Sequence, residues 1–350
     1  MIAEIGDRFP RLFFCDEGEA FYFKEDVILP EAIPPKPVQE IGMSRQDHRD
    51  LFINCVRGSC NIAAGRRISD RVLATVRLSQ MLGIEDIVAP AEISEIEFEG
   101  ERLFGVKIPP ISGANTKELD AIPDLKGYSL GYTVDAVRQL TQLVVFDFIC
   151  AQLDRHSRNI RLKTDIDYDS IVPPAEGRQY FLVLGICAID HDMSFGEVYY
   201  EDIQKRVSKG LCICPELLGQ LQYTAVDEAM CKRMFDTTET EYRDALSEYL
   251  SEEELLAFFD RIHGLKRVLD NERQREDEMK SRGEEFFSRF ISSDEMYAEY
   301  LSRMEEGAKS SHSWDLRFSY HPSYLKKKIL LHTPLSGMMP DVILSEAKDL

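Results

Sequence analysis

The chain has 350 residues, of which 44% are hydrophobic and 30% charged, and its formal net charge at pH 7 is -20. This mixture is ordinary for a globular protein and excludes fibrous and collagen-like classes, and the length favours one bilobal unit or two domains over a single small core. A surface this acidic repels phosphate backbones, so we expect no nucleic acid partner, although a local basic or metal-filled pocket could still hold a nucleotide.

In the first third of the chain, apolar patterning and turn residues predict a small β-rich unit. Residues 11–24 read as two strands around a turn at Asp16–Glu19, and the four prolines of residues 28–38 predict a loop. A short helix is expected at 45–56, a clearer one at 68–82, and two strands near 87–97 and 102–108. Ser69 or Asp70 could cap the helix at 68–82, and Gly83 is well placed to end it.

The second half is more helical. A long amphipathic helix is expected from Thr133 to about Leu153, then a strand at 160–163 and a strand at 180–189 that is apolar nearly throughout, as a strand buried on both faces would be. Beyond residue 215 the pattern is helical, with a capping box formed by Ser251 and Glu254 and a charged, solvated helix at 270–285. The last ~20 residues show no clear periodicity, which is typical of a poorly ordered terminus.

Pro109-Pro110 and Ser112-Gly113 break the pattern and predict a boundary near 109–114. We therefore expect an α+β, bilobal fold, with a small β-rich lobe over 1–110, a mainly helical lobe over 111–300 and a partly disordered extension over 301–350.

Neither a membrane span nor export is expected. No apolar run approaches the ~20 residues of a membrane helix, and Met1 to Phe9 lacks a basic-then-apolar signal pattern. The protein is therefore expected to be cytoplasmic, with its 8 cysteines reduced. Cys212 and Cys214 have no second pair at metal-finger spacing.

The strongest chemical signal is a polar cluster between the long helix and the two following strands. Asp154 and Asn159 stand five residues apart, and Asp190 follows the apolar strand 31 residues later. Phosphoryl transfer needs a carboxylate that orients a hydroxyl nucleophile and oxygen ligands for magnesium. Asn159 could supply an amide oxygen and Asp190 a carboxylate.

These residues resemble known kinase motifs. The string Asp-Arg-His-x-x-Asn at 154–159 is similar to that of HipA-type kinases and phosphoinositide kinases, and residues 189–196, Ile-Asp-His-Asp-Met-Ser-Phe-Gly, resemble their metal-binding segment. The resemblance covers about 134–196. It implies an atypical kinase-like fold in which Asp154 is the catalytic carboxylate, Asn159 supports catalysis and binds metal, and Asp190 binds metal, with Asp192 as a rival for that role.

The first lobe can be compared with the same expectation. A kinase needs a strand lysine that touches the phosphates and an acidic helix residue that fixes it. Lys24 and Asp70 are the candidates, although kinases usually have Glu at the second position. Val106 and Ile108 are expected at the hinge, where backbone groups would meet adenine. No G-x-G-x-x-G is present, which leaves either a replacement turn at 15–19 or a missing first strand.

Simpler interpretations exist for several of these residues. Asp154 and Asn159 could form only a polar turn after a helix, Lys24 could be a surface residue at a strand end, and Asp70 could be a helix cap. For His156 a structural hydrogen-bonding role is favoured over that of a base, and Arg155 is expected to brace a backbone carbonyl or a carboxylate.

The sequence thus favours a phosphotransferase that uses ATP and Mg²⁺, a HipA-like kinase with a protein Ser/Thr hydroxyl as the acceptor. A catalytically inactive kinase-like module that binds nucleotide or a partner is the main alternative. A metal-dependent phosphoesterase built on His156, Asp190, His191 and Asp192 is a further one, in which Asp190 and Asp192 could converge while His191 points away. Adenylyl transfer on the same scaffold cannot be separated from phosphoryl transfer by sequence.

Overall fold

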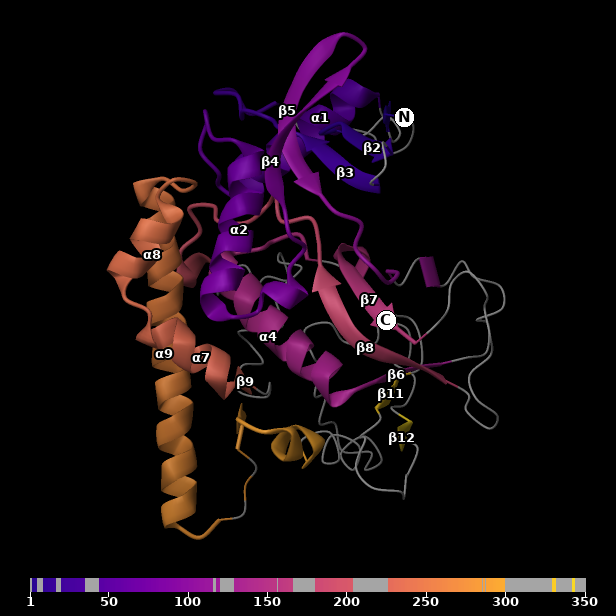
Figure 1. Cartoon of the computed structure of the whole chain (residues 1–350). Coiled ribbons are helices and arrows are strands. Elements are labelled where there is room, and N and C mark those ends of the chain that lie inside the picture. The colour runs from indigo at the N-terminus through magenta and orange to yellow at the C-terminus, as the bar shows by residue number, and fades with distance from the viewer. Residues whose placement is uncertain are drawn as a thin grey trace.

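A computed structural model gives the fold of this mixed α+β protein (Figure 1). It describes residues 2–4, 9–16, 20–34, 44–115, 118–119, 129–155, 157–165, 180–203, 226–284, 286, 288–299, 329–331 and 342–343. These segments include two five-stranded sheets and one two-stranded sheet, and the helices α2, α4, α7, α8 and α9 lie on one side of the second five-stranded sheet in Figure 1.

The first sheet is antiparallel throughout and has the order β1-β2-β3-β5-β4. Its strands are β1 (Ile2–Glu4), β2 (Leu12–Asp16), β3 (Ala20–Glu25), β4 (Glu92–Phe98) and β5 (Glu101–Ile108). The predicted strand pairs at 11–24 and near 102–108 are confirmed. The expected start of β4 near residue 87 is wrong, because Glu85–Ile87 forms a 3-10 turn instead.

The two faces of this sheet differ. One face builds a small aromatic core with Phe13, Phe23 and Leu103. Side chains two residues apart in a strand share a face, so Lys24 lies on the opposite face, paired across the ladder with Val106. The face that carries Lys24 is therefore the one available for contacts with the rest of the protein or with a ligand.

Two helices follow the first hairpin: α1 (Arg45–Ile53), which continues as a π-helical turn over Asn54–Ser59, and α2 (Ile68–Leu82). The predicted bounds of α2 are confirmed, and Gly83 ends it in the left-handed region, with φ 64°. The predicted cap is wrong. Ser69 lies inside the helix, and its backbone N–H donates to the Asp26 carboxylate at 3.0 Å, so a residue 43 positions earlier satisfies the first turn.

The second sheet has the order β12-β11-β6-β8-β7. Its strands are β6 (Ser129–Tyr132), β7 (Ile160–Thr164), β8 (Tyr180–Ala188), β11 (Ile329–Leu331) and β12 (Val342–Ile343). β8 is parallel to β6 and antiparallel to β7. The expectation that β8 is buried on both faces holds from Gly185 to Ala188 and is wrong for Leu184, which is 49% exposed. The short strands β11 and β12 are the described parts of the expected extension over 301–350.

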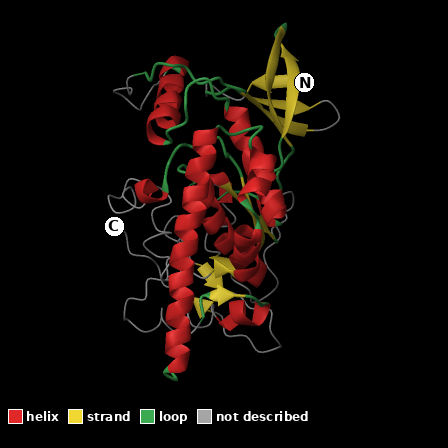
Figure 2. Cartoon of the chain, turned by 90° about the vertical axis from the view of Figure 1, so that its left-hand side faces the viewer, coloured by secondary structure: helices red, strands yellow, loops and turns green. Residues whose placement is uncertain are grey.

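The predicted long helix is α4 (Val134–Cys150), and the helices beyond residue 215 are α7 (Glu228–Asp236), α8 (Glu239–Leu246) and α9 (Glu252–Ser281). The capping box of Ser251 and Glu254 at the start of α9 is confirmed. The charged helix expected at 270–285 is the end of α9, a single helix of 30 residues that extends along most of the molecule in Figure 2.

α2 belongs to the same hydrophobic core as α4 and α9, although it lies in the first third of the chain. Ala74, Leu78 and Leu82 pack into that core, and Arg71, fully buried, pairs with Glu254 of α9 at 2.8 Å. The chain passes from the first sheet to the second over residues 109–113, and Ala114 forms a bridge to Leu162 of β7. A boundary at residue 110 therefore marks the passage from the first sheet to the second. The hydrophobic core extends across this boundary, because α2 lies before it and packs against helices that lie after it. No helix in the segments described here is long and apolar enough to cross a membrane.

The loop after β8 packs closely against the turn after α1. A Cβ atom placed on Gly196 would lie 1.6 Å from the Cys60 carbonyl oxygen. We expect Gly196→Ala to reduce the free energy of unfolding by about 3 kcal/mol, because both contacting groups are backbone and must move apart. Gly58→Ala is the control, because its nearest atom is 4.0 Å away, and it should be nearly neutral. Urea denaturation of the three proteins measures both effects, and equal stability of Gly196→Ala and wild type would contradict this packing.

Candidate active site

The first segment of the site follows α4 directly. Ala151 takes the left-handed conformation, with φ 50°, and ends the helix, which turns the chain toward Asp154. Asn159 is buried at 6% exposure, and its Nδ2 donates to the Asp154 carbonyl oxygen at 3.0 Å. Because the amide nitrogen is used in this way, the Oδ1 atom of Asn159 is the oxygen that remains to face a ligand. This hydrogen bond holds Asp154 and Asn159 in one turn.

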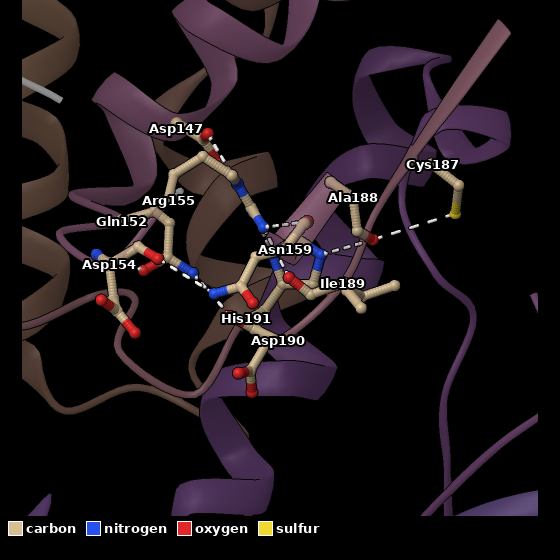
Figure 3. Close-up of polar contacts among 10 residues, drawn as sticks. All are labelled: Asp147, Gln152, Asp154, Arg155, Asn159, Cys187, Ala188, Ile189, Asp190 and His191. Carbon is tan, nitrogen blue, oxygen red and sulfur yellow. Dashed lines mark hydrogen bonds and ion pairs between the residues drawn. The ribbon is translucent and has the colours of Figure 1, made fainter. Parts of the chain in front are cut away.

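Arg155 braces this segment, as the sequence predicts. Its fully buried guanidinium makes a two-pronged ion pair with Asp147 of α4, with atoms 2.9 and 3.1 Å apart. It also donates to the carbonyl oxygens of Asn159 and Ile189, at 3.0 and 2.5 Å. A guanidinium offers five donors in a fixed plane, so this one side chain ties the end of α4 to both polar segments (Figure 3).

The second segment begins where β8 ends. Asp190 adopts a positive φ of 62°, a conformation that Asp tolerates better than most residues, and its side chain is 41% exposed whereas that of Asp192 is 7% exposed. In Figure 3 the carboxylates of Asp154 and Asp190 both extend away from the Arg155 guanidinium. The chain thus presents one accessible and one buried carboxylate beside the Asp154 segment.

Lys24 joins the first sheet to this loop. Its Nζ lies 2.7 Å from Asp190 Oδ1 and 2.5 Å from Asp192 Oδ2. Burial alone would lower the pKa of Lys24, but the two carboxylate charges outweigh it, and the Lys24 pKa is raised. Lys24 therefore carries a full positive charge at neutral pH, and a residue from the start of the chain reaches the loop that follows β8.

The two carboxylates respond differently to this arrangement. Burial followed by the neighbouring Asp190 charge raises the pKa of Asp192 to about 6. Burial also acts against ionisation of Asp190, but the Lys24 charge outweighs it and lowers the Asp190 pKa. Two close carboxylates sharing one lysine carry excess negative charge, so a second cation beside them would be favoured.

His191 points away from this pair. Arg155 can only donate, so His191 Nδ1, 3.0 Å from Arg155 Nη2, accepts, and Nε2 carries the proton donated to the Ala188 carbonyl oxygen at 3.1 Å. Burial, followed by the Arg155 charge, lowers the pKa of His191 to about 3. Both ring nitrogens of His191 are thus used in hydrogen bonds within the fold, which weakens the interpretation of the loop as a histidine-containing metal site.

Sequence reasoning missed Gln152. This side chain is 1% exposed; its Oε1 accepts from the Asp154 N–H at 3.1 Å, and its Nε2 donates to the Asp190 carbonyl oxygen at 2.9 Å. The available signal is a polar residue directly after the apolar end of α4, two positions before Asp154. Buried polar side chains usually satisfy a specific hydrogen bond.

The remaining predicted residues lie in different places. Asp70 is half-buried in the first turn of α2, and in the described segments Lys24 pairs with Asp190 and Asp192 instead of with it. Val106 is buried inside β5 beside Lys24, and Ile108 is the last residue of β5, at the passage between the sheets. His156, assigned a structural role from the sequence, and the turn at 17–19 lie outside the described residues.

The donor set of this site suits a hard cation. Asp190, Asp192 and the amide oxygen of Asn159 are oxygen ligands of the kind magnesium prefers, and the loop already stabilises the ammonium of Lys24 between two carboxylates. The described residues contain no group of three or more His, Cys, Asp or Glu that could hold a metal. A magnesium ion here would therefore need water and phosphate oxygens to complete its coordination.

Comparisons with known proteins add no assignment. No protein-family model matches this sequence, and a search of curated proteins finds none that is significantly similar to it.

Proposed function

We propose that this protein is an ATP- and magnesium-dependent phosphotransferase with a bilobal, atypical kinase-like fold. The resemblance of residues 154–159 and 189–196 to HipA-type kinases and phosphoinositide kinases makes a protein Ser/Thr hydroxyl the first acceptor to test. The bilobal arrangement would put the first sheet in the small lobe and the second sheet with its helices in the large lobe.

One observation carries this proposal. Lys24 contacts Asp190 and Asp192, although 166 residues separate Lys24 from Asp190, and Gln152 hydrogen-bonds the backbone of both Asp154 and Asp190. Three distant segments thus bring a lysine, two carboxylates and the Asp154–Asn159 turn to one place. Phosphoryl transfer requires this combination, because charge on the transferred group must be neutralised while a carboxylate orients the nucleophile.

The face of the first sheet that carries Lys24 also has an apolar surface for a base. Three exposed residues share that face: Tyr22 (39%), Ile93 (43%) and Phe104 (44%). Exposed aromatic and aliphatic side chains next to a buried lysine suit contact with a purine and its phosphates. In this proposal the adenine lies against that face, with Val106 and Ile108 near its edge.

The residues then have distinct tasks. Lys24 would leave its present partners far enough to contact phosphate oxygens, while Asn159, Asp190 and Asp192 would hold magnesium, which supplies charge neutralisation for the phosphates. Asp154 would accept a hydrogen bond from the acceptor hydroxyl and orient it for attack. Asp70 is not assigned a role with Lys24.

The test is incubation with ATP labelled at the γ-phosphate, Mg²⁺ and a mixed protein extract as the acceptor. We expect transfer by the wild type and an Asp190→Ala signal lower by about a hundredfold, because one ligand of the charge-neutralising cation is lost. Asp244→Ala is the control, because Asp244 is exposed on α8, and it should behave as wild type.

Other outcomes separate the alternatives. Transfer that survives in Asp190→Ala would overturn the proposed mechanism. Magnesium-dependent ATP binding without transfer would favour a catalytically inactive module, and label transferred only from α-labelled ATP would show adenylyl transfer. Hydrolysis of a generic phosphoester without nucleotide would favour the phosphoesterase.

A further inference from the structure

The side chain of Gln152 connects the two polar segments of the candidate site. It is almost completely buried and uses both ends of its amide, accepting from the Asp154 N–H and donating to the Asp190 carbonyl. Its own N–H donates to the Asp147 carbonyl oxygen at 2.8 Å, so the residue is also anchored on the last turn of α4. Figure 3 shows it between Asp154 and Asp190.

This connection is chemically specific. A primary amide offers one acceptor and two donor hydrogens in a single rigid plane, which a carboxylate, a hydroxyl or an ammonium cannot reproduce. Both partners are backbone groups of the residues that bear the accessible carboxylates. Asp190 has a positive φ, so a hydrogen bond to its carbonyl also helps to hold a conformation that few non-glycine residues adopt.

We propose that Gln152 is a positioning residue that fixes the Asp190 carboxylate relative to Asp154, and so sets the spacing between the metal-binding and hydroxyl-orienting groups. This assignment rests on the proposed phosphotransferase function. Arg155 cannot replace Gln152, because it holds the carbonyl oxygens of Asn159 and Ile189 and leaves that of Asp190 to Gln152.

Two substitutions test the two hydrogen bonds of the Gln152 side chain. Gln152→Met keeps the length and volume of the side chain and removes both hydrogen bonds. Gln152→Glu keeps an acceptor for the Asp154 N–H and replaces the donor to Asp190 with a second acceptor. The matched control is Gln139→Met, because Gln139 of α4 also bridges two groups, the Ile186 N–H at 2.8 Å and the Asp86 carboxylate at 3.3 Å, away from the polar segments.

The measurement is the affinity for Mn²⁺ in the presence of a non-hydrolysable ATP analogue, together with the rate of transfer and the melting temperature. We expect Gln152→Met and Gln152→Glu to weaken Mn²⁺ binding by about tenfold and to lower transfer by about 10- to 100-fold, as typical for residues that orient metal ligands. Gln139→Met should lose melting temperature and keep its Mn²⁺ affinity.

The outcomes distinguish this assignment from the proposed function. If the wild type binds Mn²⁺ with the analogue but transfers no phosphoryl group, the proposed function fails, and the Mn²⁺ affinities of the Gln152 variants still decide the positioning role. If those affinities match that of Gln139→Met, Gln152 only stabilises the fold and the assignment is overturned. If the wild type binds no Mn²⁺ with the analogue, both proposals are overturned.

Discussion

Asp154→Asn is expected to lower phosphoryl transfer by about a thousandfold while leaving nucleotide binding almost unchanged. Asparagine keeps the size of the side chain and one acceptor oxygen, but it lacks the negative charge that orients a hydroxyl and takes up its proton. The backbone contacts of this position, from the Asp154 N–H to Gln152 and from the Asp154 carbonyl to Asn159, do not involve the carboxylate. The loss should therefore appear in kcat.

Single-turnover transfer and binding of a fluorescent ATP analogue measure the two parts separately. Asp270→Asn is the control, because Asp270 is an exposed residue of α9, and both quantities should stay at the wild-type values. An Asp154→Asn protein that keeps more than about a tenth of the rate would show that Asp154 is not the orienting carboxylate.

Lys24→Met is expected to affect both activity and stability. Methionine has a similar length and can occupy the same space, but it leaves Asp190 and Asp192 facing each other without a cation. Transfer should fall by about a hundredfold or more, because a charge that meets the phosphates is lost. Breaking a buried ion pair costs about 3 to 5 kcal/mol, and since the Asp190 side chain is 41% exposed, we expect a smaller loss of about 2 kcal/mol at pH 7.5.

The stability loss should depend on pH in a definite direction. The pKa of Asp192 is already raised to about 6, and removal of Lys24 raises it further. Between about pH 4, where Asp192 titrates in the unfolded chain, and its higher pKa in the folded protein, the folded state binds more protons at Asp192 than the unfolded state does. The free energy of unfolding therefore falls as pH rises through this range. The difference in unfolding free energy between wild type and Lys24→Met should thus be smaller at pH 5 than at pH 7.5.

Urea denaturation in EDTA at the two pH values measures this difference. The double variant Lys24→Met/Asp192→Asn should recover stability without recovering transfer, because it removes the repulsion but not the need for the lysine. Lys232→Met, on the exposed face of α7, is the control. A Lys24→Met protein as stable as the wild type at both pH values would contradict the ion pairs to Asp190 and Asp192.

Local sequence patterns predicted much of the fold. The bounds of α2 follow from apolar spacing and from Gly83, and the capping box of α9 follows from Ser251 and Glu254. Such features depend on residues within a few positions of each other, so they are visible in a linear sequence. The start of β4 was misplaced, because a short apolar run at Ile87 and Val88 looks the same whether it forms a strand or packs a 3-10 turn into a core.

Contacts between distant residues were harder to predict. The sequence identifies Lys24, Asp190 and Asp192 as candidate site residues, but the kinase resemblance implies an acidic helix residue, Asp70, as the partner of the lysine. The observed partners lie beyond position 189, and only the packing of the first sheet against the loop after β8 brings them near. The cap of α2 by Asp26 is a second case, since the two contacting residues are 43 positions apart.

The ion pair between Arg71 of α2 and Glu254 of α9 has a consequence for the order in which the chain can fold during synthesis. Both side chains are completely buried, at 0% exposure, and a buried charge without its partner is strongly destabilising. Arg71 leaves the ribosome long before Glu254 is made. In a nascent chain that stops short of residue 254, α2 therefore lacks this partner, which is added only after most of the described chain has been synthesised.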